Sequence, residues 1–225
     1  MTQQQYVQRL WLVRHGVTAW NLEQRFMGHS DIPLSPLGRT QARWVGRRLR
    51  LEHVTAIYSS DLQRAHETAT IIAQQCSLQQ PVSVSSAWRE ISFGDWEGLT
   101  YAQIVDQYKS HLDFFSDPIN HPPPGGESFS HFLQRVQAAF AQLVQVAANG
   151  EADPTNRGDI VLVCHAGTIR ALLCSLLGIQ PERQRQLRLD HGSLSAIDFL
   201  PAAEDISTTI SLALLNVQSL ARPTH

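Results

Sequence analysis

Apolar residues form short unbroken runs in some segments of this chain and recur at helical spacing in others. These two patterns predict its strands and its helices. Two short apolar runs end at a histidine close to a glycine, in Leu12-Val13-Arg14-His15-Gly16 and in Val161-Leu162-Val163-Cys164-His165-Ala166-Gly167. A short apolar run that ends in this way and precedes a helical pattern is typical of a buried parallel strand leading into a helix. The strands predicted on this basis span residues 9–13, 55–58, 82–85 and 159–163.

Helical spacing of apolar residues predicts the elements between these strands. Ser35-Pro36 opens a helix at 36–50, because serine suits the N-cap and proline suits the first helical position. Further helices are predicted at 62–75, 129–147 and 167–177. Strands that alternate with helices predict an α/β fold, here a three-layer αβα sandwich around a mostly parallel sheet. Two later β segments, at 193–200 and 208–217, predict an antiparallel edge strand beside it.

Residues 88–128 interrupt the alternation of strands and helices. This insertion contains Phe93-Gly94-Asp95-Trp96-Glu97-Gly98, a helical piece near 101–108, and then Pro122-Pro123-Pro124-Gly125-Gly126. Long segments of this kind in compact domains are usually functional loops or lids. A polar, turn-rich loop is expected at 149–158. Because no repeat or linker divides the chain, residues 1–225 are expected to form one domain with a lid at about 88–128.

Polar side chains gather at the carboxyl ends of the predicted parallel strands, where open α/β sheets bind their ligands. Arg14 and His15 end the first strand, Arg64 lies in the first turn of the helix after the second, and His165 follows the strand at 159–163. Two guanidiniums, two imidazoles and free helix N-termini form a favourable environment for a phosphoryl group. Since phosphoryl transfer requires mainly positioning and charge neutralisation, such a site can act without a metal. His191 precedes the β segment at 193–200, and the sequence leaves open whether it reaches the same crevice.

Composition restricts the classes of partner. The 225 residues carry a formal net charge of -2, with 43% hydrophobic and 17% charged residues, which is typical of a globular protein. A nearly neutral chain has no general attraction for nucleic acid or an anionic membrane, so neither is expected as a partner. Three irregularly spaced cysteines, Cys76, Cys164 and Cys174, predict reduced thiols rather than a disulfide framework or a zinc site. A polar, Gln-rich segment at 1–9 without a signal-peptide core predicts a cytoplasmic protein.

Five ordered motifs resemble those of the histidine phosphatase superfamily, also called phosphoglycerate-mutase-like. They are the segment from Leu12 to Asn21 and the segments at 28–38, 58–69, 90–98 and 163–167, and together they span about residues 9–200. This resemblance implies a covalent mechanism without a cofactor or a metal, in which a histidine accepts the phosphoryl group and water then releases it. The implied roles are His15 as nucleophile, Glu90 as general acid and then base, Arg14, Arg64 and His165 as the groups that hold the phosphoryl oxygens, and Asn21, Thr18 and Gly28 as further substrate-binding residues.

Chemistry alone leaves three candidates for the general acid. Asp95 and Glu97 rival Glu90, because its neighbour Arg89 would favour an ionised carboxylate if the two side chains were close. Neighbouring residues on an extended segment point to opposite sides, so Arg89 is expected to face away. The position in the motif that resembles the family favours Glu90.

The resemblance favours a metal-independent phosphomonoesterase that acts on a small phosphorylated metabolite. A phosphoglycerate mutase is the alternative. Mutases of the family are similar to one another in a longer and more basic segment after the acid, whereas here Lys109 is the only Lys or Arg between Leu99 and Gly126. Phosphoserine is the preferred substrate, with α-ribazole phosphate and sugar phosphates as alternatives, because the 93–98 motif resembles phosphatases of all three kinds. The sequence does not decide the oligomeric state, and a homodimer is compatible with it.

Overall fold

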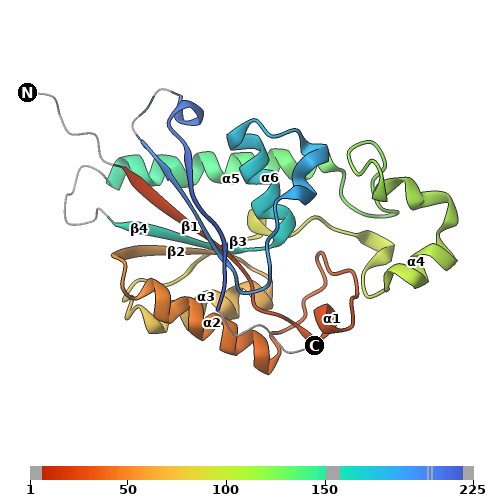
Figure 1. Ribbon diagram of the computed structural model, residues 1–225, viewed down its shortest axis with the longest axis horizontal. Coiled ribbons are helices and arrows are strands. Elements are labelled where there is room, and N and C mark those ends of the chain that lie inside the picture. The colour runs from red at the N-terminus through yellow and green to blue at the C-terminus, as the bar shows by residue number, and fades with distance from the viewer. Residues whose placement is uncertain (1–6, 151–157, 202, 204, 220–225) are drawn as a thin grey trace, which may run out of the picture.

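One mixed sheet of six strands runs through the centre of the molecule (Figure 1). The computed structural model describes residues 7–150, 158–201, 203 and 205–219. The strands are β1 (Gln8–Arg14), β2 (Val54–Ser60), β3 (Ser83–Ser85), β4 (Asp159–Cys164), β5 (Leu194–Phe199) and β6 (Ser211–Val217). Their order in the sheet is β3-β2-β4-β1-β5-β6. The first four in this order are parallel to one another, while β5 pairs antiparallel with β1, and β6 pairs antiparallel with β5.

Helices cover both faces of this sheet. The helices are α1 (Ala19–Leu22), α2 (Pro36–Leu49), α3 (Gln63–Gln75), α4 (Tyr101–Gln107), α5 (Phe129–Gly150) and α6 (Ala166–Leu177). In Figure 1, α5 and α6 lie on one side of the sheet, and α2 and α3 lie on the other. The expected three-layer αβα sandwich is therefore confirmed, and its antiparallel edge consists of two strands. Within the described ranges, no helix combines the length and the apolar character that crossing a bilayer requires.

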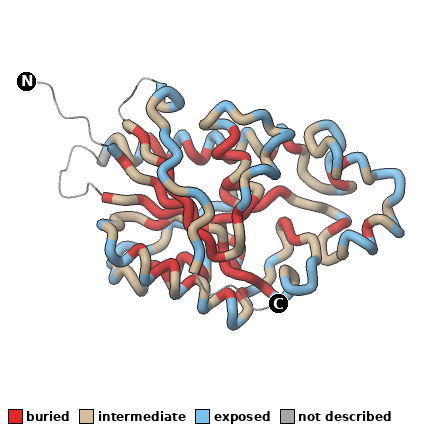
Figure 2. The backbone as a smooth tube through the Cα atoms, viewed as in Figure 1, coloured by how far each residue is buried: buried red, intermediate tan, exposed pale blue. Residues whose placement is uncertain are grey.

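The central strand β1 shows why the sheet needs a helical layer on each face. Leu10 and Leu12 belong to the core beneath α5 and α6, whereas Trp11 and Val13 belong to the core beneath α2 and α3. All four side chains are fully buried, and Figure 2 shows the buried residues concentrated in the strands. Alternate residues of a strand face opposite sides of the sheet. A strand covered on both faces therefore needs an unbroken apolar run, which is the pattern seen in the sequence.

A few element boundaries differ from the prediction. Strand β6 begins at Ser211 rather than at 208, since a 3₁₀ turn at Ile206–Thr208 precedes it. Helix α5 continues past residue 147 to Gly150, and the loop expected at 149–158 lies mostly outside the described residues. Helix α1 is absent from the prediction because it has only four residues. A reciprocal cap between Thr18 and Asn21 stabilises it.

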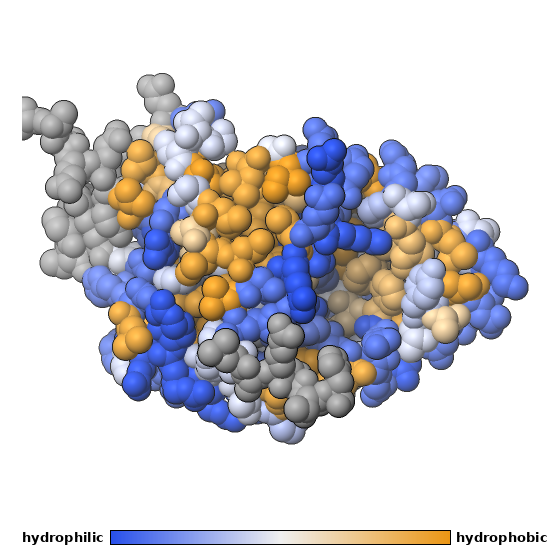
Figure 3. Space-filling view, viewed as in Figure 1, coloured by the Kyte–Doolittle hydropathy of each residue, from blue (hydrophilic) through white to orange (hydrophobic). Residues whose placement is uncertain are grey.

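The insertion at 88–128 has a small core of its own. This core consists of Trp96, Ile104 and Phe114, to which α4 and a 3₁₀ helix at Lys109–Phe115 contribute. Figure 3 shows apolar side chains gathered over the insertion and, separately, over the β5–β6 edge. Gly94 turns the chain with a φ of 54°, and a Cβ at this position would lie 2.2 Å from the Pro124 carbonyl oxygen. The turn that folds the insertion back on itself therefore requires glycine.

Leu49 and Leu51 provide a matched test of the core beneath α2. Leu49 is fully buried, whereas Leu51 is 73% exposed. We expect Leu49→Ala to lower the free energy of unfolding by about 2–5 kcal/mol, because it leaves a cavity in a close-packed interior. Leu51→Ala is expected to change it by less than about 0.5 kcal/mol. Urea denaturation followed by circular dichroism measures both values, and equal losses would contradict this packing.

Candidate active site

The two histidines that end the apolar runs meet at the carboxyl edge of the sheet. Strands β1 and β4 are adjacent and parallel, with Arg14 in register with Cys164. The residue after each strand therefore emerges at the same edge, and the imidazole centroids of His15 and His165 lie 5.2 Å apart. A backbone hydrogen bond of 3.0 Å from His15 N–H to the Cys164 carbonyl oxygen extends the pairing to this point. Residues about 150 positions apart in the sequence thus share one site.

His15 is held in one orientation and one tautomer. Its Nδ1 lies 2.7 Å from the Gly16 carbonyl oxygen, which can only accept a hydrogen bond. Nδ1 therefore carries the proton, and Nε2 carries the free lone pair. Burial, and then the positive charge of Arg64, lower the pKa of His15 well below 6.5. The ring is consequently a neutral base near neutral pH.

Two buried guanidiniums present unpaired N–H groups. Arg14 donates from Nη1 to the Leu189 carbonyl oxygen at 2.6 Å, and Arg64 donates to the carbonyl oxygens of Ser30 and Gly28 at 2.8 and 2.6 Å. Burial lowers the pKa of each guanidinium to about 10, which leaves both charged at neutral pH. The Nε atom of each arginine is buried without a hydrogen-bond partner among the residues that the structure describes. Because buried polar groups are normally paired, these N–H groups are suited to bind an oxyanion.

His165 adds two more unpaired nitrogen atoms. It precedes α6 as the N-cap residue, its side chain makes no capping hydrogen bond, and it is 1% exposed. Neither ring nitrogen has a partner within the described part of the chain. Burial lowers the pKa of His165 well below 6.5, and the charges of Arg64 and Arg14 lower it further. The ring is therefore neutral and offers one donor and one acceptor.

His191, whose role the sequence left open, also lies in this site. Its Nε2 is 2.6 Å from Nη2 of Arg14, and since a guanidinium can only donate, His191 accepts. Burial lowers the pKa of His191 to about 3, so the ring is a neutral acceptor that orients the arginine. The antiparallel pairing of β5 with β1 explains its place, because residues before β5 lie beside the end of β1. That pairing was the signal from which the position could have been predicted.

Glu90 is the one of the three candidate acids that lines the cavity of this site. Its Oε2 accepts a 2.9 Å hydrogen bond from Gly167 N–H, and a Cβ at Gly167 would lie 2.1 Å from its Oε1. Arg89 points to the opposite side and forms a bidentate ion pair with Asp61 at 2.8 and 2.6 Å.

The other two carboxylates have different surroundings. Asp95 is exposed, and the Glu97 carboxylate accepts hydrogen bonds from the backbone N–H groups of His29 and Ser30, at 2.7 and 2.5 Å. Glu97 therefore stabilises the loop after α1. Among the three, the geometry favours Glu90 as the acid.

A cavity of about 470 Å³ opens from His15 toward the insertion. Its walls contain six phenylalanines and, besides Arg14, three arginines: Phe26, Phe93, Phe114, Phe115, Phe129, Phe132, Arg25, Arg170 and Arg185. Arg170 and Arg185 come from α6 and from a 3₁₀ helix at Pro181–Gln186. Because these arginines lie outside the insertion at 88–128, a count of the Lys and Arg residues of that segment does not include them.

The remaining predicted binding residues divide into two groups. Asn21 lines the cavity. Thr18 and Gly28 are not among its lining residues: Thr18 Oγ1 accepts from Asn21 N–H at 3.2 Å, and the Gly28 carbonyl accepts from Arg64. Arg64 and His165 are likewise absent from this lining, and both are buried near His15. In the described ranges, no group of three or more His, Cys, Asp or Glu residues is arranged to hold a metal ion.

Known proteins resemble this chain in sequence over most of its length. It is 32% identical over 192 residues to a Hydrogenobacter thermophilus protein provisionally assigned as phosphoserine phosphatase 2, a match that covers 85% of this chain and 89% of the relative. It is 34% identical over 192 residues to a Salmonella choleraesuis protein provisionally assigned as phosphoglycerate mutase GpmB, covering 85% of each.

Solved structures agree with the same grouping. Mycobacterial glucosyl-3-phosphoglycerate phosphatase superposes with a TM-score of 0.80 at 33% identity, covering 94% of this chain and all of that one. The α-ribazole phosphatase of Shigella flexneri superposes with a TM-score of 0.78 at 29% identity, covering 93% and 96%. The sequence model of the histidine phosphatase superfamily (branch 1) matches residues 10–209. The chain belongs to this superfamily.

Proposed function

We propose that this enzyme is a metal-independent phosphomonoesterase that passes the phosphoryl group of a small metabolite through a phosphohistidine at His15. The observation that carries the proposal is the set of buried, unpaired nitrogen atoms near this imidazole: Nε of Arg14, Nε of Arg64 and both ring nitrogens of His165, counted among the described residues. Such groups cost free energy while unpaired, and phosphoryl oxygens would satisfy them. Structures of the mycobacterial relative with VO3 and with inorganic phosphate support this interpretation.

In the first step, His15 attacks phosphorus through Nε2. The hydrogen bond from Nδ1 to the Gly16 carbonyl fixes the neutral tautomer that this attack needs. An N–P bond forms as the ester P–O bond breaks, and Arg14 and Arg64 stabilise the negative charge on the phosphoryl oxygens. These fixed cations supply the charge neutralisation that a metal ion supplies in other phosphoryl-transfer enzymes.

Glu90 moves the protons of both steps. It protonates the leaving oxygen as the P–O bond breaks. As a carboxylate, it then takes a proton from the water that attacks phosphorus, which releases inorganic phosphate and regenerates His15. Each carboxylate oxygen accepts one backbone hydrogen bond, Oε2 from Gly167 N–H at 2.9 Å and Oε1 from Ile91 N–H at 3.0 Å, and these contacts orient the group for this transfer.

A mutase is the second candidate, because arginines other than Arg14 line the cavity and one relative is assigned as GpmB. In a mutase, these arginines would hold a carboxylate while the phosphoryl group returns to a second hydroxyl. The segment that follows Glu90 supplies only Lys109 to trap an anion and exclude water. Hydrolysis is therefore the favoured outcome.

The cavity walls support a substrate with a second acidic group, such as phosphoserine. Arg170 donates from Nε to the Leu187 carbonyl at 2.9 Å, and no carboxylate pairs with it among the described residues. Burial lowers the pKa of this guanidinium, and the negative charge of Glu90 partly offsets that effect. A substrate carboxylate would provide the missing partner.

The nucleophile and the acid are tested by substitution. His15→Ala is expected to abolish both turnover and the acid-labile phosphoenzyme, and Glu90→Gln is expected to slow turnover by about 10²–10⁴-fold. Asp95→Asn is the control and is expected to retain activity. Phosphate release from phosphoserine and ³²P labelling, both in the presence of EDTA, measure these effects. An inactive Asp95→Asn with an active Glu90→Gln would reassign the acid, and activity that requires added Mg²⁺ would contradict a metal-independent reaction.

The protonation state of the nucleophile is tested by titration. Because burial and nearby arginines lower the pKa of His15 and His165, the folded protein binds fewer protons than the unfolded chain below about pH 6.5. Stability is therefore expected to fall as the pH falls below this value, by up to about 1.4 kcal/mol per pH unit for each histidine. NMR spectra of the ring protons, assigned with His15→Gln, should show His15 still neutral at pH 5.5. A His15 titration midpoint near 6.5 would contradict the proposed environment.

Substrate choice is tested with pairs of esters. Arg170→Met is expected to lower kcat/KM for phosphoserine by about tenfold or more, the value of one charge-assisted hydrogen bond, and to leave 4-nitrophenyl phosphate nearly unchanged. Arg183→Met removes an exposed arginine that does not line the cavity and serves as the control. Equal losses for both esters would contradict a carboxylate site. Conversion of 3-phosphoglycerate to 2-phosphoglycerate, rather than to glycerate, would favour the mutase.

A further inference from the structure

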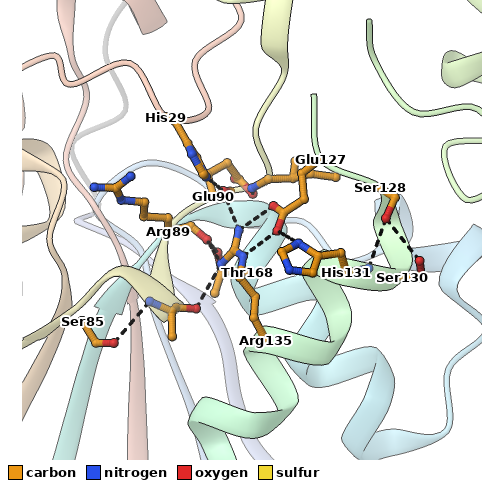
Figure 4. Close-up of polar contacts among 12 residues, drawn as sticks. His29, Ser85, Arg89, Glu90, Glu127, Ser128, Ser130, His131, Arg135 and Thr168 are labelled. Carbon is orange, nitrogen blue, oxygen red and sulfur yellow. Dashed lines mark hydrogen bonds and ion pairs between the residues drawn. The ribbon is translucent and has the colours of Figure 1, made fainter. Parts of the chain in front are cut away.

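Arg135, on the inner face of α5, contacts the backbone of the segment that carries Glu90. Its Nη1 donates to the carbonyl oxygens of Ala87 and Arg89 at 3.0 and 2.8 Å, and its Nη2 donates to the carbonyl oxygen of Glu90 at 2.8 Å. Figure 4 shows the guanidinium facing this segment, with the Arg89 side chain directed away from it. Three carbonyl groups within four residues are thus bound by one side chain.

Glu127 uses the other N–H groups of the same guanidinium. Its Oε1 accepts from Nε and its Oε2 accepts from Nη2, both at 2.8 Å, and its side chain is 8% exposed. The five hydrogen bonds equal the number of N–H donors that a guanidinium has. His131 holds Oε1 of Glu127 from the solvent side at 2.8 Å. Glu127 directly follows the Pro-Pro-Gly-Gly turn, a motif to which the proposed chemistry assigns no role.

These contacts hold the backbone of Glu90 in place. The Glu90 carbonyl oxygen also accepts from Nε2 of His29 at 3.0 Å, and the Arg89 carbonyl accepts from Oγ1 of Thr168 at 3.0 Å. The carboxylate end is held separately by the backbone N–H groups of Gly167 and Ile91. Because the backbone is held on one side, the Glu90 side chain is directed to the other side, into the cavity. A group that must reach a leaving oxygen to within a hydrogen-bond length depends on such support.

We propose that Arg135 and Glu127 form a positioning clamp that sets the proton-transfer geometry of Glu90, an inference that rests on the proposed function. Arg135 is a positioning residue, since it does not itself line the cavity; its guanidinium lies 4.8 Å from the ring centroid of Phe132, which does. Its charge is neutralised by Glu127, so the clamp acts through geometry. Lysine cannot replace it, because an ammonium has three donors and cannot bind a carboxylate and three carbonyls in one plane.

Varying the leaving group separates a loss of proton transfer from a general loss of activity. Values of kcat/KM, which report phosphoenzyme formation, are measured for phenyl phosphate and for 2,4-dinitrophenyl phosphate, whose leaving group needs no proton. Arg135→Met and Arg135→Lys are expected to lower kcat/KM for phenyl phosphate by about tenfold more than for the dinitrophenyl ester. Glu127→Gln is expected to act in the same direction with a smaller effect. Equal losses for the two esters, or no loss, would overturn the clamp.

A double-mutant cycle identifies the residue through which Arg135 acts. If it acts through Glu90 alone, Arg135→Met in a Glu90→Gln background causes no further loss with phenyl phosphate. Additive losses would overturn the proposal. Arg89→Met is the matched control, because it removes a partly exposed ion pair from the same segment and is expected to leave both esters unaffected.

Thermal unfolding verifies that each variant is folded, and Arg135→Lys replaces Arg135→Met if the latter is not. A Glu90→Gln variant without any leaving-group dependence would refute the acid assigned above. The difference in kcat/KM between the two esters in the Arg135 variants decides whether the clamp is correct.

Discussion

Burial of positive charge at the carboxyl edge of the sheet is the constraint on which the rest of this site depends. A buried guanidinium is costly unless its N–H groups find acceptors. Arg14 and Arg64 find theirs mainly in backbone carbonyl groups, at Leu189, Gly28 and Ser30. Loops far apart in the sequence must therefore converge on the end of β1. After this pairing, Nε of each arginine is left without a hydrogen-bond partner among the described residues.

The site has two parts that are supported by different elements of the fold. One part, around His15, is built on β1, β4, α3 and α6, where backbone pairing and burial leave the side chains little freedom. The other part is the cavity wall formed by the insertion, whose aromatic residues have a separate small core. The residues around His15 and the aromatic wall formed by the insertion therefore depend on different cores of the same molecule.

Much of this architecture could be predicted from local pattern, and the failures have physical causes. The parallel strands and the larger helices follow from apolar periodicity, and the meeting of His15 with His165 follows from strands that end at one edge. Helix α1 is too short to show a period. The contacts of Arg135 depend on which elements are neighbours in space, which no local pattern encodes. Two expectations stay predictions: that residues 1–225 form one domain, and that residues 88–128 act as a lid.

The first turns of α6 join parts of the site that are otherwise separate. His165 precedes this helix, Gly167 binds Glu90, Thr168 binds the Arg89 carbonyl and Arg170 lines the cavity. A helix moves as a stiff rod, so any displacement of α6 shifts the His165 ring, the Glu90 side chain and the Arg170 guanidinium together. Adjusting one of them through this helix disturbs the others. Divergence toward new substrates is therefore least costly where the wall is independent of α6, on the aromatic side of the cavity.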